Sequence, residues 1–581
     1  MQRTPGQASP HREASGSRLA VDAGTERDTE AGSARSLDIT RVSRISVWIL
    51  AAVLVVSGIA TLPRYGLTCD EAWGNMFFGE RYLHYFLTFD RSYLDFQKTD
   101  LPIHHRQPNL LASNWRVLPA VFPPLADTLS AGTMELLGHR LHWMDPIDGF
   151  HTATILMVGL FLPVLFEFAA PRIGPGTALA GIAMLITHPR LWGDLHNNVK
   201  DVPEMVFFAL VVMAAARWAA RPRVGTALLA GILGGAALAV KVNAAFIPFV
   251  VVAGLWPFAL SWNGWRPVAE HLLRTWWHYL LMVIAALATF YCVWPWLYTN
   301  PIVRFGKHVK AFVNQGHRLP HPGWNPDPIL QIITTMPELM LGLLLLGTVL
   351  LVARVATSRD ETGTFRLLLA WMIVPVLRNS WPGAVNFDGI RHFYEFLPPA
   401  ALIAALGARS LIGLVRPHWR TAAAAALASA VGANAAAAIV RYHPYETAYF
   451  NRFVGGLSGA ARVFPEATDY WGGSYRQGLE WLGQHAENGS ALFVAVHPHI
   501  VGLVSEWWLR PGIELIDSSG YEPALAARRP LYVMFVTRPE FYDDIARKCE
   551  ANLAPVHQIL VDGHPILSIY RLQGEPPGGA S

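Results

Sequence analysis

The chain has 581 residues, of which 52% are hydrophobic, only 15% are charged and 21 are tryptophan. Because an average soluble domain is about 25% charged, this composition excludes an ordinary soluble globular protein and predicts a polytopic membrane protein. The net charge of +4 is small for this length and gives no support to a nucleic-acid-binding protein. The three cysteines are far apart and form no C-x-x-C pair, so neither a disulfide framework nor a zinc site is predicted.

The N-terminal part of the chain divides into a polar tail and a first apolar run. Residues 1–43 are rich in Ser, Gly, Ala, Arg and Glu, and are predicted to be a disordered cytoplasmic tail. The run ISVWILAAVLVVSGIATL at 45–62 is long enough to span a bilayer and follows Arg41 and Arg44. We interpret it as an uncleaved signal anchor with a cytoplasmic N-terminus; the alternative is a cleaved signal peptide.

Further apolar runs predict a helical transmembrane region over residues 44–440. They begin near residues 151, 175, 203, 225, 244, 276, 329, 366, 393 and 421, which makes about eleven spans. If the spans alternate from a cytoplasmic N-terminus, every cytoplasmic loop is basic, as the positive-inside rule requires. The basic residues on these loops are Arg172, Arg217, Arg221, Arg223, Arg266, Arg274, Arg354, Arg359, Arg366, Arg409, Arg416 and Arg420. The same topology places a large first loop at 64–150, the segment 188–204 and residues 441–581 on the extracytoplasmic side.

The first external loop opens with two adjacent acids in the stretch LTCDEAWGNMFFGE at 67–80. Thr68 and Glu71 form a T-x-x-E capping box for a helix whose apolar stripe includes Trp73 and Phe77, so an amphipathic interfacial helix is predicted. Capping accounts for Glu71 but leaves Asp70 without a structural role. A helix N-terminus favours an ionised carboxylate, which makes Asp70 available as a base.

Two further external segments begin helices. In VFPPLADTLSAGTMELLG at 121–138, the double proline that includes Pro124 starts an amphipathic helix. In NNVKDVPEM at 197–205, Asp201 is able to cap the fourth span and Glu204 to close a D-x-x-E box, whereas Lys200 is not explained by capping. The segment RFGKHVKAFVNQGHR at 304–318 carries Arg304, Lys307, Lys310 and Arg318, and is either a solvated or lipid-contacting loop or a phosphate-binding one.

The last part of the chain, 441–581, is predicted to be a small extracytoplasmic α/β domain. After a connector, the runs ALFVAVHP, LYVMFVTR and HPILSIYRL are short and rich in β-branched and aromatic residues, and EFYDDIARKCEAN has helical spacing. Such a domain either takes part in recognising an acceptor or only braces the membrane region.

Several of these features together resemble the GT-C superfamily of membrane glycosyltransferases. The resemblance, over about residues 45 to 485, is to bacterial relatives of protein O-mannosyltransferases and of lipid A aminoarabinose transferases. It lies in the Asp70–Glu71 pair after a short first span, in the PPL start at Pro123, Pro124 and Leu125, and in HPR…NxKDxP before the fourth span. It continues in GIRHFYEFLPP at 389–399, YHPYETAYFNRFVGG at 442–456 and DYWGGSYRQGLEWL at 469–482. The chain departs from this pattern at Phe122, where relatives often have a polar residue.

The resemblance implies a chemistry and a set of site residues. An inverting glycosyltransferase would move a sugar from a polyprenyl-phosphate carrier to an extracytoplasmic hydroxyl on a protein, a lipid or a wall glycan. Asp70 is the expected base, and Glu71 assists it or caps the helix. The residues expected to hold the donor phosphate are Lys200, Arg391 and His392. Those expected to contact substrate are Asn197, Asp201 and Pro124.

Missing motifs narrow the alternatives. The sequence has no phosphate-binding P-loop, no dinucleotide fingerprint and no H-E-x-x-H, so no cofactor is predicted. A divalent cation held by Asp70 with Asp194 or Asp201 is the alternative to a metal-free site. A polytopic transporter or a flippase for lipid-linked sugars is the alternative function in another class, and would be expected to show internal repeats. An oligosaccharide polymerase or ligase is a second enzymatic alternative. The predicted location is the plasma membrane.

Overall fold

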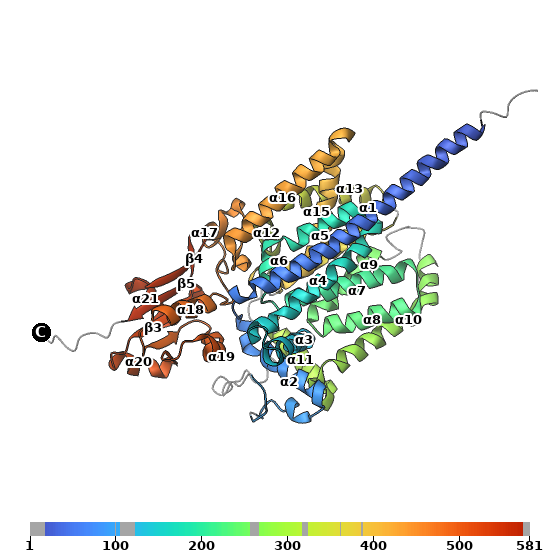
Figure 1. Cartoon of the computed structure of the whole chain (residues 1–581). Coiled ribbons are helices and arrows are strands. Elements are labelled where there is room, and N and C mark those ends of the chain that lie inside the picture. Colours follow the sequence, from blue (N-terminus) through green and yellow to red (C-terminus); the bar gives the residue numbers. More distant parts are fainter. Residues whose placement is uncertain are drawn as a thin grey trace, which may run out of the picture.

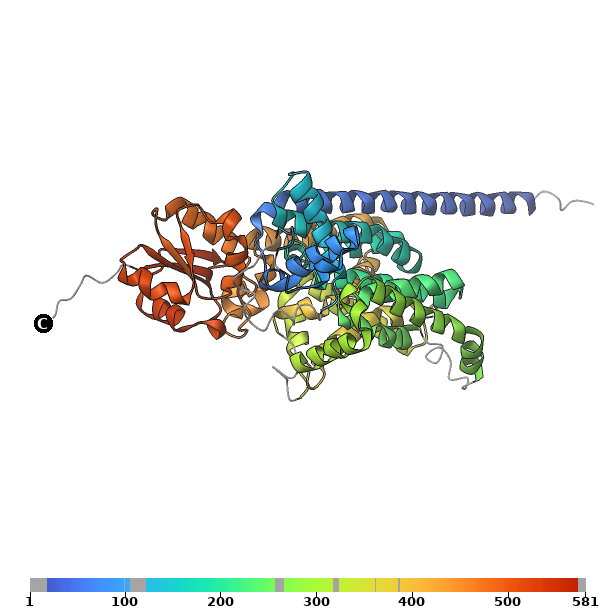
Figure 2. The same ribbon diagram turned by 90° about the horizontal axis from the view of Figure 1, so that it is seen from below.

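The computed structural model describes residues 18–98, 100–104, 122–255, 266–316, 323–360, 362–384 and 387–572. It consists of a bundle of helices followed by a smaller α/β domain (Figure 1). The small domain lies at one end of the bundle, and helix α1 projects from the other end in both views (Figures 1 and 2). The predicted fold class, a polytopic helical membrane protein with a small C-terminal α/β domain, is therefore confirmed.

In the described part of the bundle and its loops, helices follow one another with no strand between them. They are α1 (Arg18–Thr61), α2 (Met76–Thr88), α3 (Leu125–Thr133), α4 (Pro146–Ile173), α5 (Pro175–Ile186), α6 (Pro189–Asp194), α7 (Asp201–Ala220), α8 (Val224–Leu238), α9 (Ile247–Leu255), α10 (Arg266–Cys292), α11 (Pro301–Gly316), α12 (Asp327–Thr335), α13 (Glu338–Ala356), α14 (Thr364–Ser380), α15 (Leu397–Gly413) and α16 (Arg420–Tyr442).

Within the described residues, seven helical segments are long and apolar enough to cross a bilayer, and three shorter apolar helices accompany them. The predicted apolar runs coincide with α1, α4, α5, α7, α8, α9, α10, α13, α14, α15 and α16. One run differs in its start: residue 329 belongs to α12, and the long apolar helix α13 begins at Glu338. The number of eleven spans stays a prediction.

Helix α1 extends beyond the predicted span. It begins at Arg18, inside the segment predicted to be a disordered tail, and continues without a break to Thr61. Alanine, glutamate and arginine, which are frequent in this segment, have high helix propensity. The predicted boundary at residue 43 does not coincide with the start of a helix, and residues 1–17 lie outside the described residues.

The inner helices differ from the outer ones in burial. Helices α4, α7 and α15 are largely buried, whereas α1, α10, α13 and α16 expose apolar side chains such as Val56, Val349 and Val440. Apolar surfaces of this extent are typical of proteins that face lipid. Helices α13 and α15 cross closely at Gly347 and Gly407, where a Cβ atom on either glycine would collide with the backbone of the other helix.

The C-terminal domain contains a five-stranded sheet in the order β2-β1-β3-β5-β4. Its strands are β1 (Ala491–Val494), β2 (Glu514–Ile516), β3 (Leu531–Val536), β4 (His557–Val561) and β5 (His564–Leu572). Its helices are α18 (Tyr475–His485), α19 (Pro498–Trp508), α20 (Ser518–Ala526) and α21 (Asp544–Asn552), and α17 (Gly456–Ala460) lies in the connector. Strands β1, β2 and β3 are parallel, and β5 pairs antiparallel with β3 and β4.

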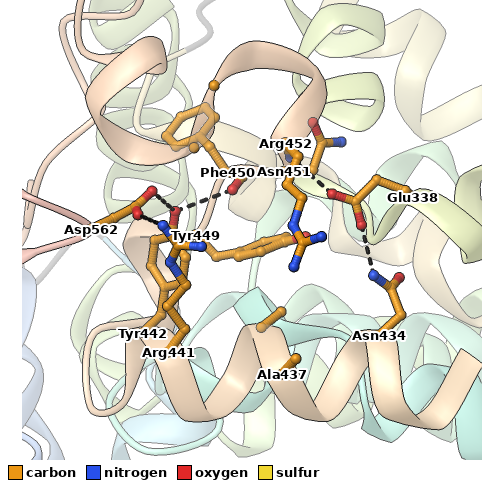
Figure 3. A pocket seen from close by; sticks show the side chains of 13 residues that line it. Glu338, Asn434, Ala437, Arg441, Tyr442, Tyr449, Phe450, Asn451, Arg452 and Asp562 are labelled. Atoms are coloured by element: carbon orange, nitrogen blue, oxygen red, sulfur yellow. Dashed lines mark hydrogen bonds and ion pairs between the residues drawn. The ribbon is translucent and has the colours of Figure 1, made fainter.

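The sheet faces the bundle with the carboxyl ends of strands β1 and β3. The turn between β4 and β5 lies at the same end of the sheet, because Val536 pairs with Leu567 near the start of β5. The turn residue Asp562 accepts hydrogen bonds from the Tyr442 hydroxyl at 2.8 Å and the Leu457 N–H at 3.0 Å, and it pairs with Arg441 (Figure 3). These contacts fasten the domain to the end of α16.

A pocket of about 200 Å³ lies beside this attachment (Figure 3). It is lined by residues of α13, α16, the connector and the β4–β5 turn. Glu338 accepts from the Arg452 N–H and the Asn434 side chain, each at 2.8 Å, on its wall. The acids of this pocket are thus engaged in holding α13, α16 and the connector together.

Candidate active site

The turn that carries Asp70 is held by the predicted capping box. The Thr68 N–H donates to Glu71 Oε2 at 2.8 Å, and the Glu71 N–H donates to the Thr68 hydroxyl at 3.4 Å. Glu71 is buried, and its Oε1 lies 2.9 Å from Nε2 of the buried His151. The turn η2 (Glu71–Asn75) is π-helical, a rare geometry that often marks functional sites. The capping box is confirmed, and the contacts of Glu71 point into the protein.

Asp70 differs from its neighbour in exposure. Its side chain is 52% exposed, and its Oδ2 lies 3.6 Å from Nη1 of Arg391. The surrounding protein desolvates the carboxyl and raises the pKa of Asp70, against the opposing charge of Arg391. Asp70 is therefore a stronger base than a surface aspartate and is also accessible.

Arg391 joins carboxylates from three segments of the chain. Its Nη1 donates to Asp201 Oδ2 at 3.2 Å, at the start of α7, and its Nη2 donates to Asp388 Oδ2 at 3.0 Å. Lys241, between α8 and the turn η8 (Val242–Phe246), pairs with the other oxygen of Asp201. The group defined here as the Arg391 cluster consists of Asp70, Asp201, Lys241, Asp388 and Arg391.

Burial separates the members of the Arg391 cluster. The side chains of Arg391, Asp388 and Asp201 are 6%, 6% and 1% exposed, so Asp70 is the accessible acid. The guanidinium of Arg391 also lies 4.2 Å from the ring centroid of Trp471, a stacking contact that fixes its plane. The cluster thus presents one reachable carboxylate against a buried, rigid cation.

His392 lies beside the cluster. Its Nδ1 is 3.4 Å from the Lys241 ammonium, and its backbone carbonyl accepts from Asn243 at 3.2 Å. Its Nε2 is buried and has no hydrogen-bond partner among the described residues. The predicted pair Arg391 and His392 is therefore found at one site, with Arg391 the member that contacts Asp70.

The predicted capping role of Asp201 is wrong. Asn198 caps α7 instead: its Oδ1 accepts from the N–H of Asp201 at 2.8 Å and from that of Lys200 at 3.3 Å. The Asn198 amide donates to Asp201 Oδ2 at 3.0 Å. The Asp201 carboxylate is drawn away from the helix end because Lys241 and Arg391 are charged donors, which bind a carboxylate more strongly than a backbone N–H does. The carboxylate oxygens of Glu204, the other end of the predicted box, have no hydrogen-bond partner among the described residues.

Lys200 forms a neighbouring ion pair at the N-terminus of α3, where Pro124 lies. The Lys200 ammonium donates to Asp127 Oδ2 at 2.7 Å and to the carbonyl of Pro123 at 2.5 Å. Pro124 is buried at the N-terminus of α3. Burial raises the pKa of Asp127 to about 6, although Lys200 and Asn75 act against this rise. Lys200 therefore holds the start of α3 in place next to the loop that carries Asp70.

Asn197 and Asp194 lie on the buried side of the site. Asn197 is buried, and its Oδ1 lacks a hydrogen-bond partner within the described part of the chain. Asp194 accepts from the Asn198 amide at 3.1 Å and from the Tyr394 hydroxyl. Burial raises the pKa of Asp194 to about 7. The described ranges contain no group of three or more His, Cys, Asp or Glu side chains arranged to hold a metal ion.

The basic segment at 304–318 lies mainly on α11. Lys307 and Lys310 are exposed there, and Arg304 donates to the carbonyl of Trp296. Arg318 lies outside the described residues. No contact between this helix and the Arg391 cluster is found in the described ranges.

Comparison with known proteins identifies the fold. No protein-family profile and no curated protein sequence matches the chain. The crystal structure of ArnT from Cupriavidus metallidurans bound to undecaprenyl phosphate aligns with a TM-score of 0.50 at 13% identity, over 90% of this chain and 97% of ArnT. This chain has the GT-C fold.

Two other solved structures match with lower scores. ArnT from the same organism in the apo state has a TM-score of 0.43 at 14% identity, over 90% of this chain and 97% of ArnT. The mycobacterial arabinofuranosyltransferase AftD has a TM-score of 0.42 at 16% identity, over 92% of this chain and 42% of AftD.

Within this GT-C fold, the sequence analysis missed Lys241, Asp388, Asp127 and Asn198. Lys241 had a usable signal, because a lone lysine in the apolar stretch 225–255 is costly unless it has a function or a partner. Asp388 precedes Arg391 by three residues and takes a left-handed backbone conformation, with φ of 56°. No periodicity marks such a turn.

Proposed function

We propose that this protein is an inverting glycosyltransferase that moves a sugar from a polyprenyl-phosphate carrier to a hydroxyl acceptor outside the cytoplasm. The observation that carries the proposal is the accessible Asp70 carboxylate facing the buried Arg391 at 3.6 Å, in a chain with the GT-C fold. The ArnT structure with the same fold contains undecaprenyl phosphate, which supports a carrier of this chemical class.

The proposed reaction is a single displacement. Asp70 accepts the proton of the acceptor hydroxyl as its oxygen bonds to the anomeric carbon of the sugar. The bond between that carbon and the phosphate oxygen breaks on the opposite face, which inverts the configuration. The electron pair leaves with the polyprenyl phosphate, whose growing negative charge Arg391 stabilises.

The remaining predicted residues support these two groups. Glu71 fixes the turn of Asp70 through Thr68, and Lys200 fixes the start of α3 through Asp127. Asp201 orients Arg391 and Lys241, and His392 lies behind Lys241. We keep Asn197 and Pro124 as candidates for substrate contact.

We infer that the site faces the extracytoplasmic side of the plasma membrane. Asp201 starts α7 in the Arg391 cluster, whereas Arg217 and Arg221 lie at the other end of this helix. A helix of 20 residues is about 30 Å long, which is the thickness of the hydrocarbon core. The positive-inside rule assigns the arginine end to the cytoplasm.

The test uses the full-length protein in detergent with two assays. Binding of undecaprenyl phosphate is measured first, and transfer from radiolabelled polyprenyl-phosphate sugars to delipidated envelope extract second. Asp70→Asn is expected to keep carrier binding within a few-fold and to lose at least about 100-fold in transfer, the contribution typical of a general base.

Asp100→Asn is the matched control, because Asp100 is an exposed acid in the same external loop. It is expected to bind and transfer like the wild type. Folded wild-type protein that binds no polyprenyl phosphate would contradict the proposal and favour a transporter. Full transfer by Asp70→Asn would remove Asp70 from the role of base.

A further inference from the structure

Arg538 of the C-terminal domain reaches the membrane site. It follows the carboxyl end of β3, at the end of the sheet that faces the bundle, and its side chain is 9% exposed. Its Nη2 donates to Asp388 Oδ1 at 2.8 Å, and its Nη1 donates to the carbonyl of Tyr470 at 2.9 Å. The carboxyl ends of parallel strands are the usual place for functional side chains in α/β domains.

Asp388 is shared between two arginines. Its Oδ1 accepts from Arg538, and its Oδ2 accepts from Nη2 of Arg391 at 3.0 Å. The other amino group of Arg391, Nη1, faces Asp70 and Asp201. A continuous path of charged contacts therefore runs from the C-terminal domain to the accessible acid: two hydrogen bonds join Arg538, Asp388 and Arg391, and an ion pair of 3.6 Å joins Arg391 to Asp70.

The formal charges of the Arg391 cluster sum to zero when Arg538 is counted with it. The Arg391 cluster contains two cations, Lys241 and Arg391, and three carboxylates, so by itself it carries one net negative charge. Arg538 brings the sum to zero. A buried carboxylate that loses one of its cationic partners remains only partly compensated, and its charge repels an incoming phosphate.

The domain is also held firmly enough to place this side chain. At the same end of the sheet, Asp562 accepts hydrogen bonds from Tyr442 and Leu457. At the end of β1, His499 on α19 lies against Trp73 of η2, with 6.1 Å between ring centroids. One apolar core includes Leu67 and Ala72 of the first external loop together with residues of the C-terminal domain.

We propose that Arg538 is a positioning residue of the membrane site, which holds Asp388 so that the guanidinium of Arg391 stays aimed at Asp70 and at the phosphate of the carrier. This inference rests on the proposed function. It makes the C-terminal domain part of the site and not only a brace.

The experiment measures the Kd of the full-length protein for undecaprenyl phosphate, together with kcat and KM for transfer. Arg538→Gln is expected to weaken binding about tenfold or more, the size typical of an uncompensated buried charge. Arg538→Lys keeps the charge and is expected to recover part of the loss. Arg529→Gln is the matched control, because Arg529 of the same domain forms a surface pair with Glu514. It is expected to bind like the wild type.

A double variant separates a positioning role from a purely structural one. Asp388→Asn removes the carboxylate through which Arg538 is proposed to act, so adding Arg538→Gln to Asp388→Asn is expected to weaken binding no further. Melting temperature and gel filtration establish that each variant is folded.

The outcomes are distinct. Wild-type binding by Arg538→Gln would overturn the inference while leaving the proposed function intact. A folded double variant that binds several-fold more weakly than Asp388→Asn alone would also overturn it, because Arg538 would then not act through Asp388. Absence of binding by the wild type would overturn the proposed function, and the inference with it.

Discussion

Three aspartates contact Arg391, but they differ in their hydrogen-bond partners and in their exposure, and we therefore expect them to have different roles. Asp201 is saturated by Lys241, Arg391 and Asn198, and Asp388 by two arginines. Asp70 forms one ion pair among the described residues, with Arg391 at the longer distance of 3.6 Å, and half of its side chain is exposed. Carboxylates that are fully engaged hold other groups in place, whereas one that is open and weakly paired is able to take up a proton.

The position of Asp70 has a consequence for the pH dependence of activity. Desolvation by the surrounding protein raises the pKa of Asp70, and the nearby charges of Asp388 and Asp201 act in the same direction. Only the ionised form is a base, so kcat/KM is expected to be full above this raised pKa and to fall as the pH drops through it. The acid limb of a pH profile of transfer should lie above the ordinary aspartate value of about 3.9.

Asp388→Asn provides the comparison for this profile. It removes a negative charge that raises the pKa of Asp70, so the acid limb is expected to move to lower pH. A shift to higher pH, or an acid limb unchanged in this variant, would contradict the assignment of the limb to Asp70.

At the residue level, the sequence predicted Asp70 and Arg391 but not what holds them. Both stand in short motifs that resemble a known superfamily, so they were chosen as candidates without distances. Lys200 was predicted for the phosphate, yet its ammonium is already paired with Asp127, 73 positions away in sequence. Arg538 and Asp388 are 150 positions apart, and no local pattern connects them. Such pairs follow from tertiary packing.

At the level of elements, helix packing depends on small residues where spans cross. Gly347 of α13 and Gly407 of α15 bring the two backbones into contact. Gly407→Val is expected to force these helices apart and to destabilise the protein by about 1–3 kcal/mol, as overpacking does. A fall in the thermal midpoint in detergent, measured by intrinsic tryptophan fluorescence, checks this.

Gly413→Val is the control for this substitution. Gly413 ends the same helix, and a Cβ atom there would meet no atom within 4 Å. Its thermal midpoint is expected to match that of the wild type. Equal losses in both variants would show that valine itself, and not the crossing of α13 and α15, lowers the stability.

Elements with strong patterns were predicted well, and short ones were not. Long apolar runs predicted the spanning helices, and runs rich in Val and Ile predicted β1, β3 and β5. Strand β2 has three residues and β4 lies at the sheet edge, partly exposed, so neither had a distinct periodicity. The N-terminal half of α1 was missed because a polar composition predicts disorder even where helix propensity is high.

At the level of the whole molecule, the arrangement predicts a fixed orientation. The C-terminal domain lies at the opposite end of the bundle from the projecting part of α1 (Figure 2). Alkaline phosphatase fused after Leu572 is expected to be active, because it would fold outside the cytoplasm. The same enzyme fused after Arg221 is expected to be inactive. The reverse pair of activities would contradict the proposed side of the site.

The end of the sheet that faces the bundle limits which C-terminal domains are able to replace this one in a chimera. Helix α19, the loop after β3 and the turn between β4 and β5 make contacts through His499, Arg538 and Asp562. Arg476 of α18 and Trp508 of α19 add hydrogen bonds to Asp148 and Asp145 at the start of α4. A chimera that exchanges the C-terminal domain therefore keeps a complete site only if these segments match the host bundle. The described strand residues at the opposite end of the sheet make none of these contacts. Insertions or fused reporters placed there are the ones compatible with an intact enzyme.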